Sequence, residues 1–172
     1  MRHNADFWII HLRLIDHVEG GAFRETYRSS LMTPKSVLPE GFKGDRNIST
    51  AIYFLLKEGQ FSAFHRIASD EMWHFYYGDT LEVFEITSSG KLITHRLGNN
   101  PGLGESFQCV VSAGSWFGSK IVTGGEYSLV GCTVSPGFDF NDFELADRDE
   151  LTKQYPQYTE LIKQLTKSEN AG

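Results

Sequence analysis

The sequence predicts a mainly β protein, an antiparallel sandwich or barrel, and three observations support this class. Apolar and polar residues alternate with a period of two through most of residues 48–135. Glycine-containing turns interrupt the alternation at short intervals, and the 172 residues include 17 glycines. Aromatic residues make up 13% of the chain, and such residues favour strands. This length suits one domain with a sizeable core.

An amphipathic helix is expected at residues 5–16, ahead of the sheet. Asn4 can cap it, and Phe7, Ile10 and Leu14 form an apolar stripe. The adjacent glycines that follow, Gly20 and Gly21, mark a turn or a close approach of the backbone.

Residues 23–28 then alternate like a strand, whereas residues 31–46 carry two prolines and scattered charge. This second segment is expected to be a loop, and it is the best candidate for a lid or a crossing arm.

The remaining strands are expected at regular intervals along the chain. Their predicted ranges are 48–56, 61–67, 71–77, 80–87, 91–97, 107–112, 115–122 and 126–135. Helices are expected at 144–154 and 157–167, on the outside of the barrel, with Pro156 suited to a first helical turn. The chain is therefore expected to form a single domain over 1–172. Its parts would be a helix, strand and arm (1–47), the barrel core (48–135) and a C-terminal segment with helices (136–172).

Composition and charge narrow the possible partners and the compartment. The net charge is −6 and no Lys/Arg cluster stands out, which argues against a nucleic-acid partner. No apolar run approaches the ~18 residues of a membrane span, and the N-terminus does not resemble a signal peptide. Cys109 and Cys132 lack a CxxC spacing and are expected to be free thiols, which fits the reducing cytoplasm.

The stretch GQFSAFHRIASDEMWHFYYG, residues 59–78, has a specific spacing. Five residues separate Gly59 from His65, Glu71 follows six positions after that His, and six residues separate Glu71 from Gly78. This resembles the first motif of the cupin superfamily, G(X)5HXH(X)3-4E(X)6G, with Ile67 in place of the second His. The second cupin motif is only faintly matched at residues 112–117, where Phe117 takes the His position.

The resemblance narrows to the Cupin_5 family, also called DUF985, and it covers nearly the whole chain. The segments that carry it are HVEGGAFRETYRSS (17–30), STAIYFLL (49–56), FHRIASDEMWHFYYGD (64–79), SAGSWFG (112–118) and LVGCTVSPGFDFNDFELADRDEL (129–151). It implies a double-stranded β-helix, the cupin jelly roll, with a pocket inside the barrel and a homodimeric assembly. The resemblance implies no settled reaction.

The resemblance leaves His65 and Glu71 as the main site candidates. In cupins that bind metal, three His and one carboxylate converge on the barrel axis. Ile67 and Phe117 cannot act as ligands, and an open metal site needs about three protein ligands. We therefore expect no metal cofactor.

A metal site built from His65, Glu71 and His74 is the alternative. His74 faces away from Glu71 on an unbroken strand, so this set requires a β-bulge near Asp70.

Without a metal, His65 and Glu71 on adjacent strands are expected to form a His–carboxylate pair suited to general base catalysis. The alternative is a satisfied polar pair that has no function. The other expected site residues are Tyr77 as a catalytic proton donor, and Trp73, His74, Phe75, Trp116 and Tyr53 as ligand-binding residues.

The sequence also predicts where several residues outside the motif spacing lie. His17, Glu19, Arg24 and Glu25 are expected beside the barrel mouth, where they either anchor a dimer arm, the interpretation we favour, or bind substrate. Ser62 and His95 are expected in solvated or turn positions. The aromatic residues Phe138, Phe140 and Phe143 are expected to form a turn that seals one barrel end.

The leading functional hypothesis is a metal-independent isomerase or epimerase that acts on a small polar metabolite. A sugar or sugar nucleotide is favoured by fold-level analogy with cupin epimerases. One alternative is a small-molecule-binding protein without catalysis. The other is a metal-dependent isomerase or oxygenase.

Overall fold

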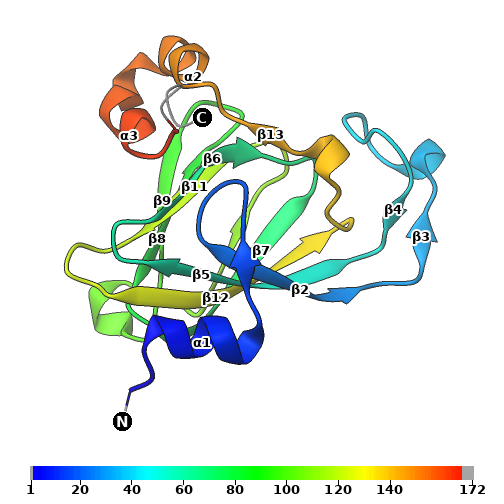
Figure 1. Cartoon of the computed structure of the whole chain (residues 1–172). Helices are drawn as coiled ribbons and strands as arrows, with labels where there is room; N and C mark the ends of the chain where they lie inside the picture. Colours follow the sequence, from blue (N-terminus) through cyan, green and yellow to red (C-terminus); the bar gives the residue numbers. More distant parts are fainter. Residues whose placement is uncertain (1, 168–172) are drawn as a thin grey trace.

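Two antiparallel sheets pack face to face around the main core in this computed structural model, which describes residues 2–167. The larger sheet consists, in spatial order, of β1 (Ile15–Asp16), β2 (Ala22–Arg28), β5 (Thr50–Lys57), β12 (Tyr127–Ser135), β7 (Asp70–Gly78) and β10 (Gln108–Val111). The smaller sheet consists of β13 (Glu144–Leu145), β6 (Phe61–Arg66), β11 (Trp116–Ile121), β8 (Leu81–Ile86) and β9 (Leu92–Leu97). The predicted mainly β class, with an N-terminal helix and C-terminal helices, is confirmed (Figure 1).

Side chains from the inner faces of both sheets form the main core. On β5, Phe54 and Leu56 are buried in it, and the predicted alternation places Thr50 and Ile52 on the same face, where they line a cavity. Inner residues of the smaller sheet, including Val83 on β8, meet them from the opposite side. The period of two therefore predicts correctly which residues of β5 face the main core.

A β-bulge in β6 interrupts this alternation. Phe117 pairs with His65 and Ser119 pairs with Ser62, so β6 holds one more residue than β11 across the interval. Both Ser62 and His65 consequently point inward, although they are three positions apart. Phe61, which a strict alternation over the predicted strand 61–67 places on the same face as His65, turns outward instead and packs under the C-terminal helices. The expected alternation is therefore wrong at this position.

A second bulge lies in β7. Val130 pairs with Phe75 and Leu129 pairs with Tyr77, which leaves one extra residue in β7. The alternation reverses at this point, so Tyr77 reaches the outer face of the larger sheet.

Helix α1 (Ala5–Leu12) packs against the outer face of the larger sheet (Figure 1). Asn4 caps it as predicted, because its side chain accepts a hydrogen bond from the amide of Phe7. The helix ends earlier than the expected residue 16, because Arg13 adopts a left-handed conformation with φ 54°. The expected apolar stripe is also wrong, since Ile10 is exposed and Trp8 packs on the sheet instead.

The C-terminal elements α2 (Arg148–Gln154), η4 (Pro156–Tyr158) and α3 (Thr159–Gln164) cover the outer face of the smaller sheet. The helix expected at 144–154 begins later, because the Asp147 side chain caps it and β13 occupies the residues before. Pro156 lies in the first turn of η4, as expected. The last five residues of the expected C-terminal segment, 168–172, lie outside the described part of the chain.

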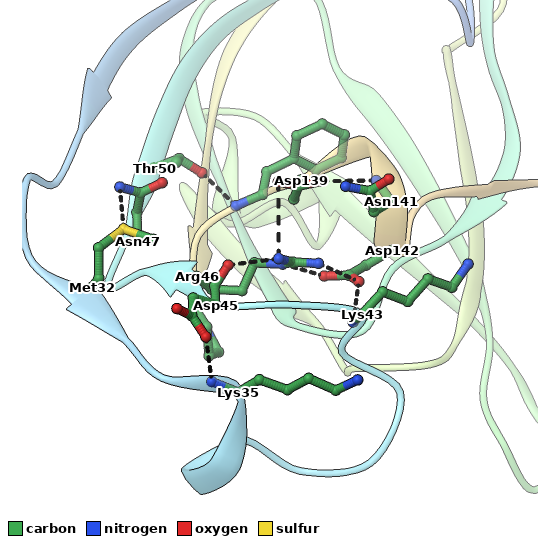
Figure 2. A network of polar contacts seen from close by, with 12 residues as sticks. Met32, Lys35, Lys43, Asp45, Arg46, Asn47, Thr50, Asp139, Asn141 and Asp142 are labelled. Atoms are coloured by element: carbon green, nitrogen blue, oxygen red, sulfur yellow. Dashed lines mark hydrogen bonds and ion pairs between the residues drawn. The ribbon is translucent and has the colours of Figure 1, made fainter.

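The expected loop at residues 31–46 is an arm with structure of its own. It contains β3 (Met32–Thr33), η1 (Lys35–Val37) and β4 (Arg46–Asn47), and β3 pairs with β4. The arm projects to one side of the sandwich (Figure 1). Arg46 ties it to the segment that contains η3 (Phe140–Asp142), through hydrogen bonds from Nε and Nη2 to the two carboxylate oxygens of Asp142, each 2.6 Å long (Figure 2).

None of the helices within residues 2–167 has the length and apolar character that crossing a membrane requires. A short helix, η2 (Pro101–Leu103), completes the described elements.

Candidate functional site

A cavity of about 280 Å³ opens at one end of the sandwich, beside β2, β5 and β12. It receives both His65 and Glu71, the two residues that the motif spacing singles out, and they are 3% and 7% exposed. The side chains that line it are His17, Glu19, Phe23, Glu25, Arg28, Thr50, Ile52, His65, Glu71, Cys132, Val134, Phe138, Asp139 and Phe140.

A tight turn ahead of β2 brings Glu19 into this cavity. The amide of Gly20 donates to the carbonyl of His17, and the amide of His17 donates to the carbonyl of Gly21. Gly20 has φ 113° and lies against the carbonyl of Phe61, where a Cβ atom would clash. The amide of Ala63 also donates to the carbonyl of Glu19, at 2.8 Å, which ties the turn to β6.

The Glu19 carboxylate is the closest charged partner of His65. Its Oε2 lies 3.1 Å from Nε2 of His65 and 3.6 Å from Nδ1 of His17. Its Oε1 accepts a hydrogen bond of 2.9 Å from the hydroxyl of Ser62. Ser62 is fully buried, so its expected solvated position is wrong, and the bulge in β6 is the reason.

The backbone determines which nitrogen of His65 carries a proton. Nδ1 lies 2.7 Å from the carbonyl oxygen of Ala63, which can only accept, so Nδ1 is the protonated nitrogen of the neutral ring. Nε2 therefore presents its lone pair to Glu19. Burial lowers the pKa of His65 and raises the pKa of Glu19. Whichever of the two atoms carries it, one proton lies between Nε2 of His65 and Oε2 of Glu19, which are 3.1 Å apart.

Glu71 faces the same cavity with few partners. Within residues 2–167, the thiol of Cys132 is the donor that its carboxylate meets, and no N–H or O–H group bonds to it. Burial raises the pKa of Glu71 to about 7, and the nearby Glu19 carboxylate adds to the effect while His65 opposes it. Glu71 can therefore both hold and release a proton near neutral pH.

Three of the expected site residues lie on the outer face of the larger sheet. His74 faces away from Glu71, and its Nε2 and Nδ1 each lie 3.0 Å from a polar atom, Oγ1 of Thr133 and Nε2 of Gln108 respectively. Tyr53 packs edge-on against Tyr76, outside the cavity. Tyr77 lies beside Trp8 and Tyr127, so the expectation that its hydroxyl faces the barrel pocket is wrong.

The three other expected ligand-binding residues, Trp73, Phe75 and Trp116, also lie outside this cavity. Trp73 is fully buried in the core, against Phe54 and Phe117, and does not line the cavity. Phe75 borders a different hollow, near β9 and the end of β7. Trp116 lies under the C-terminal helices with the guanidinium of Arg66 over its ring, because its neighbour Phe117 occupies the inward position on β11.

The walls of the cavity come instead from residues that the motif spacing does not indicate. Phe23, Phe138 and Phe140 supply aromatic surface, so the turn at residues 138–143 contributes to the cavity as well as closing the end of the sandwich. The glycine pair after Glu19 and the match of residues 17–30 to the family were the features that indicated this region. His95, expected to be solvated, pairs with buried Glu85 at 2.8 Å, away from the cavity.

The residues present do not form a metal site of the kind that metal-binding cupins contain. Ile67 is buried in the core and Phe117 packs on His65, so hydrocarbon side chains occupy the two missing ligand positions. His74 lies on the opposite face of β7 from Glu71. Within residues 2–167, no three His, Cys, Asp or Glu side chains are grouped so that they could hold a metal ion.

Comparison with known proteins agrees with the jelly-roll sandwich and the motif. The family described as Cupin_5, cupin superfamily (DUF985), matches residues 6–146. The chain belongs to the Cupin_5 family. The Cupin_5 chain is 31% identical to the Saccharomyces cerevisiae protein YML079W over 149 residues, which cover 81% of this chain and 74% of the yeast protein.

Solved structures agree over almost the full length of this Cupin_5 protein. The crystal structure of protein SO0799 from Shewanella oneidensis is similar, with a TM-score of 0.86, 42% identity and coverage of 97% of this chain and 99% of that one. A hypothetical protein from Leishmania major gives a TM-score of 0.89 at 34% identity, with 96% and 100% covered. The names of these relatives state no activity.

Proposed function

We propose that this Cupin_5 protein binds a small polar metabolite in the cavity and catalyses a metal-independent proton transfer on it, as an isomerase or epimerase. One observation carries the proposal. Two buried acid–base groups, Glu71 and the His65–Glu19 couple, line one small cavity. Perturbed titratable groups that converge in a cavity are characteristic of active sites.

The proposed roles differ from those expected from the sequence, because Nε2 of His65 is already engaged by Glu19. Glu71, with a pKa of about 7, is the better base toward a ligand, because a catalytic group works best when its pKa is near the operating pH. Ionised Glu71 removes a proton from the carbon next to a carbonyl, and the electron pair moves to the carbonyl oxygen.

The His65–Glu19 couple supplies the second proton. Glu19 and Nε2 of His65 share one proton across 3.1 Å, and that proton passes to the developing alkoxide. For the isomer, protonated Glu71 returns its proton to the former carbonyl carbon while the couple takes the proton of the adjacent hydroxyl, which becomes the new carbonyl. For the epimer, a proton from water reaches the original carbon from the opposite face while the couple takes back the proton it gave, and Glu71 releases its proton to water. Sugars are the first class of compound to test, by fold-level analogy alone.

The test is solvent proton exchange. Purified protein is incubated in D₂O with a panel of small sugars, and deuterium at carbon is followed by NMR and mass spectrometry. Wild-type protein is expected to incorporate deuterium, and His65→Ala and Glu71→Gln are each expected to lose about 10²- to 10⁴-fold of the rate. Tyr77→Phe, on the outer face, is the matched control and keeps the wild-type rate. Wild-type turnover that survives in His65→Ala would remove His65 from the mechanism.

A second candidate is a binding protein without catalysis. Hydrocarbon side chains at Ile67 and Phe117 favour it, because they replace the catalytic metal ligands of other cupins. Compounds that raise the melting temperature of the protein, yet gain no deuterium at carbon, would support this candidate over the enzyme.

We also propose a homodimer, as the family resemblance implies. The outer face of the larger sheet exposes Met72, Tyr76 and Val110, and apolar patches of this kind often mark interfaces. Sedimentation analysis of the wild type and of Tyr76→Glu tests this: the variant is expected to dissociate, and a monomeric wild type would contradict the proposal.

The cytoplasm is the proposed compartment, because both Cys109 and Cys132 are free thiols and a reducing environment keeps them so. Fractionation of cells that produce the protein, with antibody detection, is the measurement; recovery outside the cytoplasm would contradict it.

A further inference from the structure

The charges around the cavity indicate what kind of ligand fits it. Glu71 is 7% exposed and lines the cavity. Within residues 2–167 its carboxylate meets only the weak donor of Cys132. Ionising a buried carboxylate that has no strong hydrogen-bond donor costs free energy. A ligand that places a positively charged donor beside Glu71 offsets this cost and therefore binds more tightly than a neutral ligand of the same shape.

Glu19, the other buried carboxylate in the cavity, already has hydrogen-bond and charge partners. Glu19 accepts from Ser62 and contacts His65. The ammonium of Lys167 lies nearby, where it donates to the carbonyl of Val18 at 2.6 Å and lowers the pKa of Glu19. Among residues 2–167, no Lys or Arg shifts the pKa of Glu71; besides burial, the groups that do so are His65, Glu19 and Cys132.

The guanidinium at the cavity wall is not free to bind a phosphate. Arg28 donates from Nε and Nη2 to the two carboxylate oxygens of Glu25, at 2.9 and 2.7 Å. Its Nη1 donates to Oδ1 of Asn47 and to the carbonyl of Phe138. These contacts use most of its five N–H donors and cancel its charge locally. Asp139 adds a further carboxylate to the lining.

Aromatic surface completes the environment. Phe23, Phe138 and Phe140 line the cavity, and Phe138 and Phe140 lie edge to face with centroids 4.9 Å apart. Aromatic faces attract organic cations and ammonium groups, and they offer nothing to a phosphate.

We propose that the ligand of this cavity is a small aminated polyol, such as an amino sugar, whose ammonium group binds the Glu71 carboxylate and which carries no phosphate. This inference rests on the proposed function only in taking the cavity as the ligand site. For this class of ligand it makes Glu71 the counter-ion of the ammonium group, in place of the role as base that the proposed function gives it. The inference narrows the class of ligand in two ways. Sugar nucleotides are excluded, because their phosphates find no free cation among the residues described at the cavity wall. Neutral sugars are disfavoured, because they leave the Glu71 carboxylate without a counter-charge. A cavity of about 280 Å³ matches one ring-sized molecule.

The test compares matched probes that differ in one group. Isothermal titration at about pH 8, where Glu71 is ionised, measures the binding of glucamine, sorbitol and sorbitol 6-phosphate. Ethanolamine and ethylene glycol form a smaller matched pair. We expect each amine to bind at least about tenfold tighter than its neutral partner, and sorbitol 6-phosphate to bind more weakly than sorbitol.

Three variants locate the binding. Glu71→Gln is expected to abolish the preference for the amine, and Ile52→Trp, which fills the cavity from β5, is expected to abolish binding of every probe. Glu85→Gln is the matched control, because Glu85 is also a buried carboxylate but pairs with His95 away from the cavity; it is expected to keep the preference. Circular dichroism and urea unfolding confirm that each variant folds.

The outcomes separate this inference from the proposed function. Glucamine that binds no tighter than sorbitol, or a phosphate that binds tightest, overturns the inference and leaves the cavity as a ligand site. Amine binding that persists unchanged in both Glu71→Gln and Ile52→Trp also overturns it, and so does a wild type that binds none of the probes. Amine binding without deuterium exchange supports the inference and counts against the catalytic function.

Discussion

Nε2 of His65 lies 3.1 Å from Oε2 of Glu19, and the two residues reach each other across 46 positions of sequence. Ser62 bonds the second oxygen of the same carboxylate, and His17 flanks it. A turn before β2 and a bulge in β6 together create this contact.

Removal of the Glu19 carboxylate is expected to destabilise the protein. Glu19→Ala leaves the hydroxyl of Ser62 and Nε2 of His65 buried without their partner, which costs about 1–3 kcal/mol for each unsatisfied group. Urea unfolding followed by fluorescence measures the loss. Glu58→Ala, at an exposed turn, is the control and is expected to stay within about 0.5 kcal/mol of the wild type. Equal stability of both variants would show that the Glu19 contacts contribute little.

The pH dependence of stability is expected to report on Glu71. Burial raises its pKa from 4.5 to about 7, so the folded protein binds this proton more tightly than the unfolded chain. The contribution of Glu71 to stability is therefore present below about pH 4.5, falls as the pH rises to about 7, and is constant above.

Glu71→Gln cannot ionise, so the difference in unfolding free energy, variant minus wild type, should rise across that window by about 3 kcal/mol. The buried imidazole of His65 has a lowered pKa and contributes in the opposite direction, since stability is lost as the pH falls below its unfolded value; it is present in both proteins. Urea unfolding at unit intervals from about pH 5 to pH 8 is the measurement. A difference that does not vary with pH would show that the pKa of Glu71 is not raised.

The arm is expected to depend on one ion pair. Arg46 is 4% exposed and binds both oxygens of Asp142 (Figure 2). Two parallel N–H···O bonds to a carboxylate are the strong form of this ion pair. In Arg46→Lys, which cannot form the two-pronged contact, amide exchange in residues 31–47 should become faster than in the wild type.

Arg66→Lys is the control for this experiment, because Arg66 forms an exposed ion pair with Glu144. Exchange in the arm should be unaffected by it. Unchanged protection of the arm in Arg46→Lys would show that other contacts hold it in place.

The bulge in β6 is expected to require glycine opposite to it. A Cβ atom on Gly118 would lie 2.8 Å from the carbonyl oxygen of Ser62 and 3.2 Å from the amide nitrogen of Phe64. Gly118→Ala should therefore cost about 1–3 kcal/mol through overpacking, measured by urea unfolding. Gly102→Ala, next to the exposed side chain of Asn100, should cost less. A Gly118→Ala variant as stable as the wild type would contradict the role assigned to the bulge.

The strand pattern and the motif spacing allow the fold and part of the cavity lining to be predicted. Alternation placed Thr50, Ile52 and Phe54 on one face, and the motif spacing brought His65 and Glu71 to one cavity. The alternation does not predict the position of Tyr77, because a bulge between Phe75 and Tyr77 reverses it. Periodicity cannot locate such a bulge, since an extra residue changes the face without changing the composition.

The sequence by itself determined the class of fold, the family and the pair His65 and Glu71, which line one cavity, because these depend on local alternation and on fixed spacing. Only the tertiary structure decided that Glu19 is the nearest charged partner of His65 and that Phe138 and Phe140 line the cavity. It also decided that Glu71 meets no strong donor among residues 2–167. These facts depend on contacts between distant segments and on exclusion from water, and both arise only when the two sheets, the turn and the bulges are assembled together.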